Sequence, residues 1–278
     1  METNVIYQGE CSNVMQNKIP DNSIDLTVTS PPYDNLRDYE GYEFNYKPIV
    51  KELYRATKTG GIVIWIVSDE TIDFDETCNS AKQKLFFKEI GFKVLDTMIY
   101  IKENYPPAYP HLRRYANQFE YMFVLVKGKK PKTFNPIKKN KVRNREEKVA
   151  YRQKDGSLKR KIKKKSHSDK KKATNVWSYS VGGSCTRDKF AYKHPAMFPE
   201  KLAQDHIKSW SNEGDVILDP MCGSGTVLKQ AEIFNRKWIG IDIAEKYVNL
   251  SYKRVGKVNQ SYYKELPKSE RPAQKQLF

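Results

Sequence analysis

Hydrophobic residues along this chain follow the two spacings that distinguish strands from helices. From Ile24 to Thr29 apolar and polar residues alternate, which predicts a strand with one buried face. Other stretches read as short apolar runs or as amphipathic helices. The expected strands are 5–7, 24–29, 62–67, 92–101, 120–126, 216–218 and 237–243, the expected helices are 12–18, 46–57, 80–90, 200–210, 227–234 and 245–258, and Gly60–Gly61 is an expected break. This alternation indicates an α/β fold with a doubly wound, mostly parallel sheet.

The charge of the chain is concentrated in one segment. The 278 residues carry a formal net charge of +17, and residues 127–172 hold 21 Lys and Arg against 4 Asp and Glu, which accounts for the entire excess. This segment has few large apolar residues, so it cannot bury much core of its own. Its charge favours nucleic acid as a partner, with a solvated segment or a localisation signal as the alternatives.

Cysteine and histidine usage excludes several classes of protein. The four cysteines form no Cys-x-x-Cys pair, and the four histidines have no metal-ligand spacing. The longest apolar runs, 62–67 and 121–126, are too short to span a membrane, and no secretory leader opens the chain. We therefore expect a cytoplasmic protein with no disulfide framework, no metal and no membrane span.

The strand at 24–29 runs into Ser30-Pro31-Pro32-Tyr33. Prolines lack the N–H group that a strand needs, so the carbonyls of Ser30 and Pro31 are expected to lie fixed at a strand end, where α/β sheets bind ligands. The Ser30 hydroxyl and the Pro31 carbonyl can accept hydrogen bonds from an amino group on a planar base, while Pro32 fixes the turn and Tyr33 stacks. Such a base must first leave its duplex, at a cost of about a few kcal/mol. The alternative is a Pro-Pro turn with a packed tyrosine.

A second turn joins the strand at 216–218 to a helix. Its residues are Asp219, Pro220, Met221, Cys222, Gly223, Ser224, Gly225 and Thr226. Glycines let the backbone approach a ligand, and Asp242, at the tip of the next strand, can hold ribose hydroxyls. A P-loop would need lysine at Thr226, and a dinucleotide fingerprint would need glycine at Leu228. The turn therefore favours a nucleoside ligand, with a purely structural turn as the alternative.

Together these turns resemble two motifs of the amino-methylating DNA methyltransferases. Asp-Pro-Met-Cys-Gly-Ser-Gly-Thr at 219–226 resembles their S-adenosylmethionine motif, and Thr-Ser-Pro-Pro-Tyr at 29–33 resembles their catalytic motif. The catalytic motif comes first, as in the permuted β class, and the resemblance covers most of 5–126 and 192–258. It implies a circularly permuted Rossmann-like fold, S-adenosylmethionine as methyl donor, S-adenosylhomocysteine as product, and direct transfer to a flipped base without a metal or a covalent enzyme intermediate.

The resemblance also implies roles for individual residues. The segment 194–202 is similar to a further cofactor motif, and Gln8-Gly9-Glu10 stands where the family usually has Gly-Asp, so glutamate at 10 is a departure. The expected catalytic residues are Ser30, Pro31, Pro32 and Tyr33. The expected cofactor-binding residues are Glu10, Phe198, Pro199, Asp219, Pro220, Cys222, Gly223, Ser224, Gly225, Thr226 and Asp242.

Serine at position 30 favours one target base. Adenine-specific relatives more often carry Asp or Asn there, so we expect site-specific methylation of cytosine N4 in double-stranded DNA, within or derived from a restriction-modification system. The alternatives are N6-adenine methylation, methylation of RNA or of a protein amide, and a non-catalytic basic nucleic-acid-binding protein. C5 methylation needs a Pro-Cys nucleophile, and no Pro-Cys pair occurs. Cys222 is expected to be a small packing residue.

The family places its target-recognition region between the two halves, where the basic segment lies. We expect a discontinuous catalytic domain (1–126 and 192–262), a basic recognition insert (127–191) and a flexible tail (263–278). The candidate DNA-binding residues are Arg143, Arg145, Arg152 and Arg160.

Expected partners are double-stranded DNA and a cognate restriction endonuclease, for a bacterial or phage-encoded monomer or homodimer. The tail, with Gln274, Leu277 and Phe278, also resembles the peptide that docks replication proteins on the sliding clamp. A frayed tail is the alternative.

Overall fold

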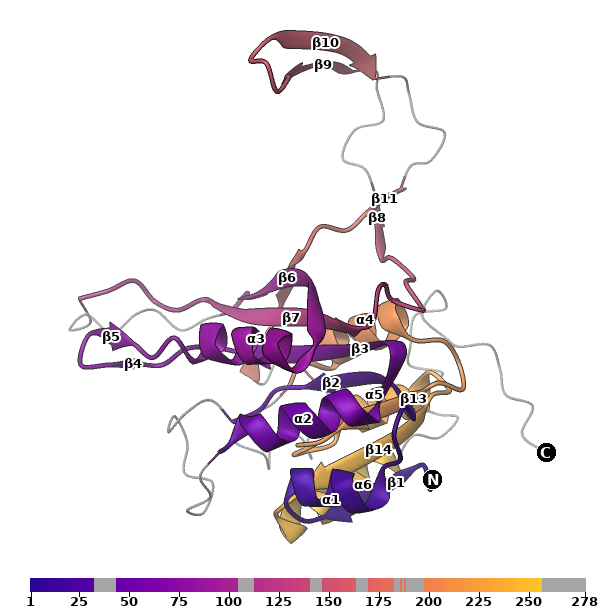
Figure 1. The fold of residues 1–278 in the computed structure, drawn as a ribbon. Helices are drawn as coiled ribbons and strands as arrows, with labels where there is room; N and C mark the ends of the chain where they lie inside the picture. Colours follow the sequence, from indigo (N-terminus) through magenta and orange to yellow (C-terminus); the bar gives the residue numbers. More distant parts are fainter. Residues whose placement is uncertain are drawn as a thin grey trace. The chain divides into compact units, whose positions relative to one another are not determined.

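A central eight-stranded sheet organises the protein (Figure 1). The computed structural model describes residues 1–32, 44–104, 113–140, 147–163, 170–182, 186, 188 and 198–256. In order across the sheet the strands are β1 (Val5–Gln8), β14 (Lys237–Asp242), β13 (Val216–Asp219), β2 (Ile24–Thr29), β3 (Thr57–Val67), β7 (Phe119–Lys127), β6 (Phe92–Lys102) and β12 (Val176–Tyr179). The first five are parallel, β7 is antiparallel to both of its neighbours, and β12 is parallel to β6. The predicted α/β class with a mostly parallel sheet is confirmed.

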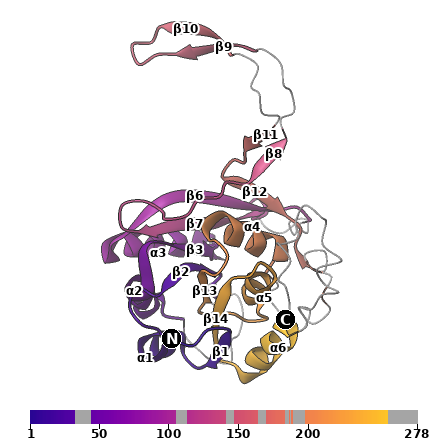
Figure 2. The same ribbon diagram turned by 90° about the vertical axis from the view of Figure 1, so that its right-hand side faces the viewer.

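Helices cover both faces of the sheet, as a doubly wound fold requires. Figure 2 shows α1 (Cys11–Lys18), α2 (Tyr46–Ala56) and α3 (Asn79–Ile90) on one side, and α4 (Glu200–Trp210), α5 (Thr226–Ile233) and α6 (Glu245–Val255) on the other. On the first face the rings of Trp65 and Phe87 meet edge to face, 5.1 Å apart, in a buried cluster with Met15 and Leu53. Burying side chains of this size stabilises the fold by about 1.5–3 kcal/mol each.

Strand β2 is buried on both faces, so the prediction of one exposed face is wrong. It lies between two parallel strands and under helices on both sides, an environment that leaves no solvated face. Two of its three polar residues, Asp25 and Thr29, find partners in the interior instead. The carboxylate of Asp25 binds Lys58 Nζ at 2.6 Å and accepts the backbone N–H of Val216 at 3.0 Å.

The expected break at Gly60–Gly61 is also wrong, because β3 continues through both glycines. Gly60 adopts φ +83°, a left-handed conformation that favours glycine. A Cβ atom on Gly61 would lie 3.1 Å from the Asp25 carbonyl oxygen. The glycines thus let β3 pass close to β2, where their register shifts between Ile24 and Leu26.

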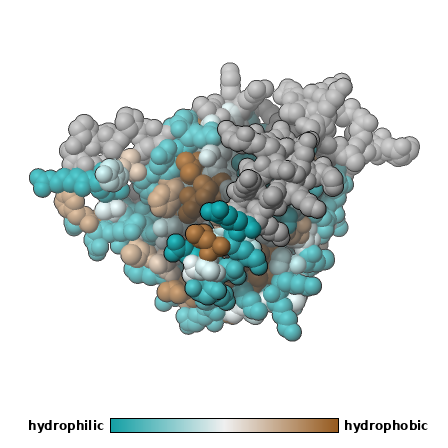
Figure 3. Space-filling model, turned by 90° about the horizontal axis from the view of Figure 1, so that it is seen from above, coloured by the Kyte–Doolittle hydropathy of each residue, from teal (hydrophilic) through white to brown (hydrophobic). Residues whose placement is uncertain are grey.

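Other element boundaries agree closely with expectation, and α4 spans 200–210 as predicted. The small hairpin of β4 (Thr71–Ile72) and β5 (Asp75–Glu76) was not expected. In the view of Figure 3 the described surface is mostly hydrophilic, consistent with a chain in which 30% of residues are charged.

Residues 136–174 form a second compact unit, which we call the basic unit; residues 1–135 and 175–278 form the first, which we call the body. The basic unit contains the antiparallel hairpin of β9 (Glu147–Arg152) and β10 (Leu158–Lys163). It also contains the pair of β8 (Lys138–Asn140) and β11 (Lys170–Lys172). None of the side chains that the structure describes in the basic unit is buried. Backbone pairing, rather than a hydrophobic core, organises its described part.

Candidate active site

The corner after β2 carries the expected catalytic residues. Pro31 is buried, while Ser30 and Pro32 are half-buried. The strand stops here because two successive prolines have no N–H to donate to a neighbouring strand. Tyr33, the fourth expected residue, lies outside the described residues.

This corner lies beside the turn that follows β13. The two strands are parallel neighbours, with Leu26 opposite Ile217 and Thr27 opposite Leu218. At their carboxyl ends the buried Thr29 hydroxyl donates a hydrogen bond of 2.9 Å to Asp219 Oδ1. A bond of this length joins the last residue of β2 to the first residue of the glycine-containing turn. The two corners singled out in the sequence therefore adjoin.

The glycine-containing turn is closed by its own hydrogen bonds. Gly223 and Gly225 adopt φ +50° and +73°, and Gly225 caps the N-terminus of α5. The backbone N–H groups of Cys222 and Gly225 donate to carbonyls of Ile241 and Cys222, and that of Gly223 donates to Asp242. These three N–H groups are therefore already used within the protein.

Asp242 stands at the tip of β14 with a fixed carboxylate. Its Oδ2 accepts the N–H of Gly223 at 2.8 Å, and its Oδ1 accepts the N–H of Ala244 at 2.9 Å. Burial raises the pKa of this carboxyl above its usual value. The side chain is half-buried rather than fully buried, and each oxygen retains acceptor capacity for a hydroxyl. An oriented acceptor pair beside a glycine turn fits the ribose of a nucleoside cofactor.

Asp219 is buried beside this carboxylate, and the cost of burying charge raises its pKa to about 7. The hydrogen bonds from Thr29 and the Met221 N–H oppose that rise. Burial likewise raises the pKa of the Cys222 thiol well above its usual value. A thiol that remains protonated is a poor nucleophile, in keeping with the expected packing role of Cys222.

Glu10 follows β1 at the same edge, since Gln8 pairs with Asp242 and the Gly9 N–H donates to the Asp242 carbonyl at 3.0 Å. Its carboxylate caps α1, accepting the backbone N–H groups of Ser12 and Asn13 at 2.9 and 2.8 Å. Partial burial opposes ionisation, but these hydrogen bonds outweigh it and lower the pKa of Glu10. A capping role therefore accounts for both carboxylate oxygens.

The remaining candidates lie in three places. Phe198 and the buried Pro199 immediately precede α4, with Pro199 as its N-cap. Arg152 and Arg160 are exposed on β9 and β10 of the basic unit. The other candidates, Arg143, Arg145, Gln274, Leu277 and Phe278, lie outside the described residues.

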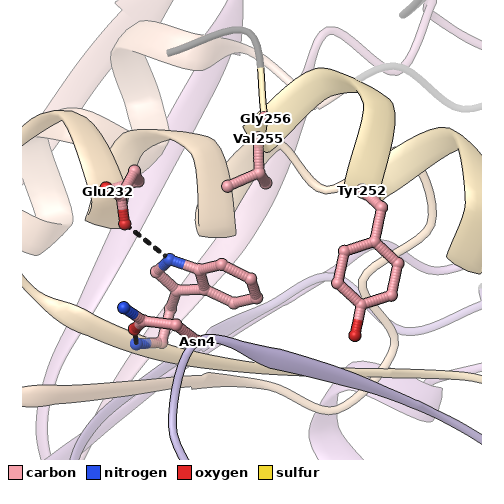
Figure 4. A pocket seen from close by; sticks show the side chains of 6 residues that line it. Asn4, Glu232, Tyr252, Val255 and Gly256 are labelled. Carbon is pink, nitrogen blue, oxygen red and sulfur yellow. Dashed lines mark hydrogen bonds between the residues drawn. The ribbon is translucent and has the colours of Figure 1, made fainter. Parts of the chain in front are cut away.

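A pocket of about 310 Å³ lies elsewhere on the body. Its lining residues are Asn4, Glu232, Trp238, Tyr252, Val255 and Gly256, and Trp238 Nε1 donates to Glu232 Oε2 at 2.9 Å (Figure 4). Asn4 precedes β1 and Trp238 lies near the start of β14. The pocket is therefore at the amino ends of these strands, the opposite edge from the two adjoining corners.

Two features of the described residues bear on metal and membrane binding. The described residues include no group of three or more His, Cys, Asp or Glu able to hold a metal ion. No helix among them is long and apolar enough to cross a membrane.

Sequence reasoning missed two residues of this site. Thr29 opens the Thr-Ser-Pro-Pro-Tyr motif, but the sequence assigns its side chain no role, because its partner Asp219 is known only once β13 lies beside β2. Arg254, which is fully buried and hydrogen-bonded to Ser224 in the turn, was not considered. A signal existed, because Arg254 follows the buried Leu250 and Ser251 at helical spacing and so falls on the inward face of α6.

Comparison with known proteins defines the class. A family model described as DNA methylase (N6_N4_Mtase) matches residues 24–253. The orphan methyltransferase M.BamHII of Bacillus amyloliquefaciens is 48% identical over 246 residues, covering 87% of this chain and 92% of the relative. The type II methyltransferase M.BglII of Bacillus subtilis is 28% identical, covering 90% and 68%.

Solved structures agree on the fold. The PvuII DNA methyltransferase, titled cytosine-N4-specific, matches with a TM-score of 0.66 at 17% identity, covering 92% of this chain and 88% of that one. The complex of M1.HpyAVI with SAM matches with a TM-score of 0.59 at 21% identity, covering 90% and 98%. The chain belongs to the N6/N4 DNA methylase family and is an amino-DNA methyltransferase of the β class.

Proposed function

We propose that this DNA methyltransferase transfers a methyl group from S-adenosylmethionine to the exocyclic N4 amino group of cytosine in double-stranded DNA. When bound, S-adenosylmethionine supplies an activated methyl group on a sulfonium. In the reaction a carbon–nitrogen bond forms, a carbon–sulfur bond breaks to leave S-adenosylhomocysteine, and the amine releases one proton to solvent.

One observation carries this proposal: the 2.9 Å hydrogen bond between Thr29 and Asp219. It keeps the Ser30–Pro32 corner and the glycine-containing turn at one edge of the sheet. An amino group held at the first corner then lies next to a methyl donor held at the second. In-line transfer needs reacting atoms about 3–3.5 Å apart before the bond forms. Corners on opposite edges of the sheet would have ruled out a single transfer step.

The residues of the first corner act on the amine. Its lone pair is delocalised into the base, so the nitrogen must become tetrahedral before it can attack. The Ser30 hydroxyl and the Pro31 carbonyl accept hydrogen bonds from its N–H groups and so favour the tetrahedral nitrogen. Pro32 holds the corner rigid. Tyr33 stacks on the base and holds it outside the duplex.

The residues of the second corner bind the donor. Asp242 accepts hydrogen bonds from the ribose hydroxyls of the cofactor. Phe198 and Pro199 line the methionine side of the cofactor site. The turn from Asp219 to Thr226 approaches the cofactor closely because of its glycines. Glu10 lies at the same edge, with its carboxylate directed to the helix cap.

Cytosine N4 is favoured by serine at position 30, and the PvuII enzyme with the same fold is titled cytosine-N4-specific. N6-adenine methylation is the competing function, since the 26% identical relative YhdJ of Escherichia coli is named a DNA adenine methyltransferase. The type II names of relatives such as M.HpaI and M.BglII support an origin in restriction-modification, whereas the 48% identical M.BamHII is named an orphan methyltransferase.

The basic segment binds the DNA. We assign target recognition to residues 127–191, with Arg152 and Arg160 among the contacts and Arg143 and Arg145 as further candidates. Their charges neutralise phosphates and release counterions, so affinity falls steeply with salt.

The test is product analysis. DNA incubated with the protein and S-adenosylmethionine is digested to nucleosides and examined by mass spectrometry for N4-methylcytosine and N6-methyladenine. N4-methylcytosine alone is the expected result, and N6-methyladenine alone would establish the competing function. No transfer to DNA, with transfer to RNA or protein, would overturn both.

A further inference from the structure

Arg254, in the last turn of α6, reaches into the glycine-containing turn. The side chain is fully buried. Its Nη1 donates to the Ser224 carbonyl at 2.6 Å, and it lies 2.8 Å from Ser224 Oγ and 3.0 Å from Thr226 Oγ1. One guanidinium nitrogen therefore holds the two polar residues that flank Gly225 in the turn.

The other nitrogens of Arg254 face two carboxylates. Nε binds Asp188 Oδ2 and Nη2 binds Glu200 Oε1, both at 3.0 Å. The nearly buried Lys229 of α5 binds the same two carboxylates, at 3.1 and 3.0 Å. Two cations thus face two anions. Burial alone would raise the pKa of Asp188, but Arg254 and Lys229 outweigh it and lower that pKa.

An ion cluster of this kind is weak evidence for added stability, because desolvating the charges costs about as much as their attraction returns. The importance of the cluster lies in which segments of the chain it holds together. Glu200 is the first residue of α4 and follows Phe198 and Pro199 directly. Asp188 lies in the chain between β12 and α4. The cluster therefore ties the glycine-containing turn to the segment that enters α4.

We propose that Arg254 is a positioning residue for the methyl donor. Through Ser224, Thr226 and Glu200 it sets the spacing between the turn and the Phe198–Pro199 segment. These are the two parts assigned to the cofactor, so the inference rests on the proposed function. Lys229 supports it by holding both carboxylates in place.

The test compares Arg254→Lys with Arg55→Lys. Lysine keeps the charge but loses the planar fork that reaches several acceptors at once. Arg55 is a matched control, because it also makes several bonds, to the Ile19 and Met15 carbonyls and to Asp21, but joins α1 and α2 on the other face of the sheet. Calorimetric binding of S-adenosylmethionine and thermal unfolding are measured for both variants and the wild type.

For Arg254→Lys we expect the Kd for S-adenosylmethionine to rise about tenfold, with KM rising in parallel and kcat at saturating cofactor within about threefold of wild type. Arg55→Lys should lower the melting temperature but leave that Kd within about twofold. Equal Kd values in the wild type and both variants would overturn the inference.

If Arg254→Lys does not fold, the double variant Glu200→Gln with Lys229→Met decides the question. It removes one charge of each sign, so the remaining Arg254–Asp188 pair stays balanced. A tenfold rise in its Kd supports the positioning role, and an unchanged Kd refutes it. A wild-type protein that binds no S-adenosylmethionine at all would instead refute the proposed function.

Discussion

The body and the basic unit of this protein are organised by opposite means. The body surrounds a sheet whose central strand β2 is buried on both faces, and the side chains of Asp25 and Thr29 on this strand are hydrogen-bonded in the interior. The basic unit has no buried side chain among its described residues, and all but its last two residues belong to the segment 127–172 that carries the whole net charge of the chain. Catalysis that depends on sub-ångström placement needs a rigid, buried framework such as the body. Binding to a polyanion requires only exposed positive charge, as in the basic unit. Substitutions in the body should therefore change catalysis or stability, whereas substitutions in the basic unit should change DNA binding.

The largest effect is expected at Ser30. Ser30→Ala removes an acceptor that matters most when the amine becomes tetrahedral, so kcat should fall about 100- to 1,000-fold. The Kd for S-adenosylmethionine and the affinity for DNA should stay within about twofold. Ser23→Ala is the control, since that serine lies just before β2 at the other edge and its hydroxyl donates to the nearby Pro20 carbonyl. Single-turnover methylation kinetics provide the measurement, and full activity in Ser30→Ala would refute its role.

The next largest effect is expected in the pH dependence of stability, through the buried Asp219 of the body. The pKa of Asp219 is raised to about 7 in the folded chain, so between about pH 4 and 7 the native state holds a proton that the unfolded state has released. Stability from this group is therefore present at low pH and is lost as pH rises towards 7, with a slope of up to about 1.4 kcal/mol per pH unit. Asp219→Asn cannot titrate.

The measurement is urea unfolding of the wild type and of Asp219→Asn from pH 4 to 8. The free-energy difference, wild type minus variant, should decline across that range and level off above pH 7. The buried His206 titrates in both proteins, with its pKa lowered by burial to about 3, so it cancels in the difference. A difference that stays flat from pH 4 to 8 would show that Asp219 is already ionised in the folded protein, and would refute the raised pKa.

The smallest effect is expected in the basic unit. Arg152→Ala and Arg160→Ala should each weaken DNA binding only a few-fold at physiological salt, because each removes one of many positive charges. The slope of log affinity against log salt should fall by about 0.9 for each lost phosphate contact. Melting temperature and cofactor binding should not change.

Lys51→Ala and Lys82→Ala, exposed on α2 and α3 of the body, are the controls for charge alone. Fluorescence anisotropy with labelled duplex DNA at several salt concentrations separates the cases. An equal loss of slope for arginines and lysines would mean that the basic unit has no special part in binding.

Much of the fold and part of the site were determined by sequence alone. Strands alternating with helices specified an α/β sheet, because local hydrophobic period reflects which face is buried. The Pro-Pro corner and the glycine-containing turn were recognisable because proline and glycine act on their own backbone, whatever surrounds them. The concentration of charge in 127–172 was equally plain.

Tertiary structure decided what depends on partners distant in the chain. The alternation in β2 suggested a solvated face, but β13, β3 and the helices on both sides enclose the strand. Its Thr29 side chain binds Asp219, and its Asp25 side chain binds Lys58 and the Val216 N–H. Only the placement of β13 beside β2 revealed that Thr29, 190 residues before Asp219, joins the two corners. Arg254 likewise gained its position only when α6 packed beside the turn. A hydrogen bond between residues distant in the chain produces no periodic pattern in the sequence. Such contacts are therefore visible only in the tertiary structure.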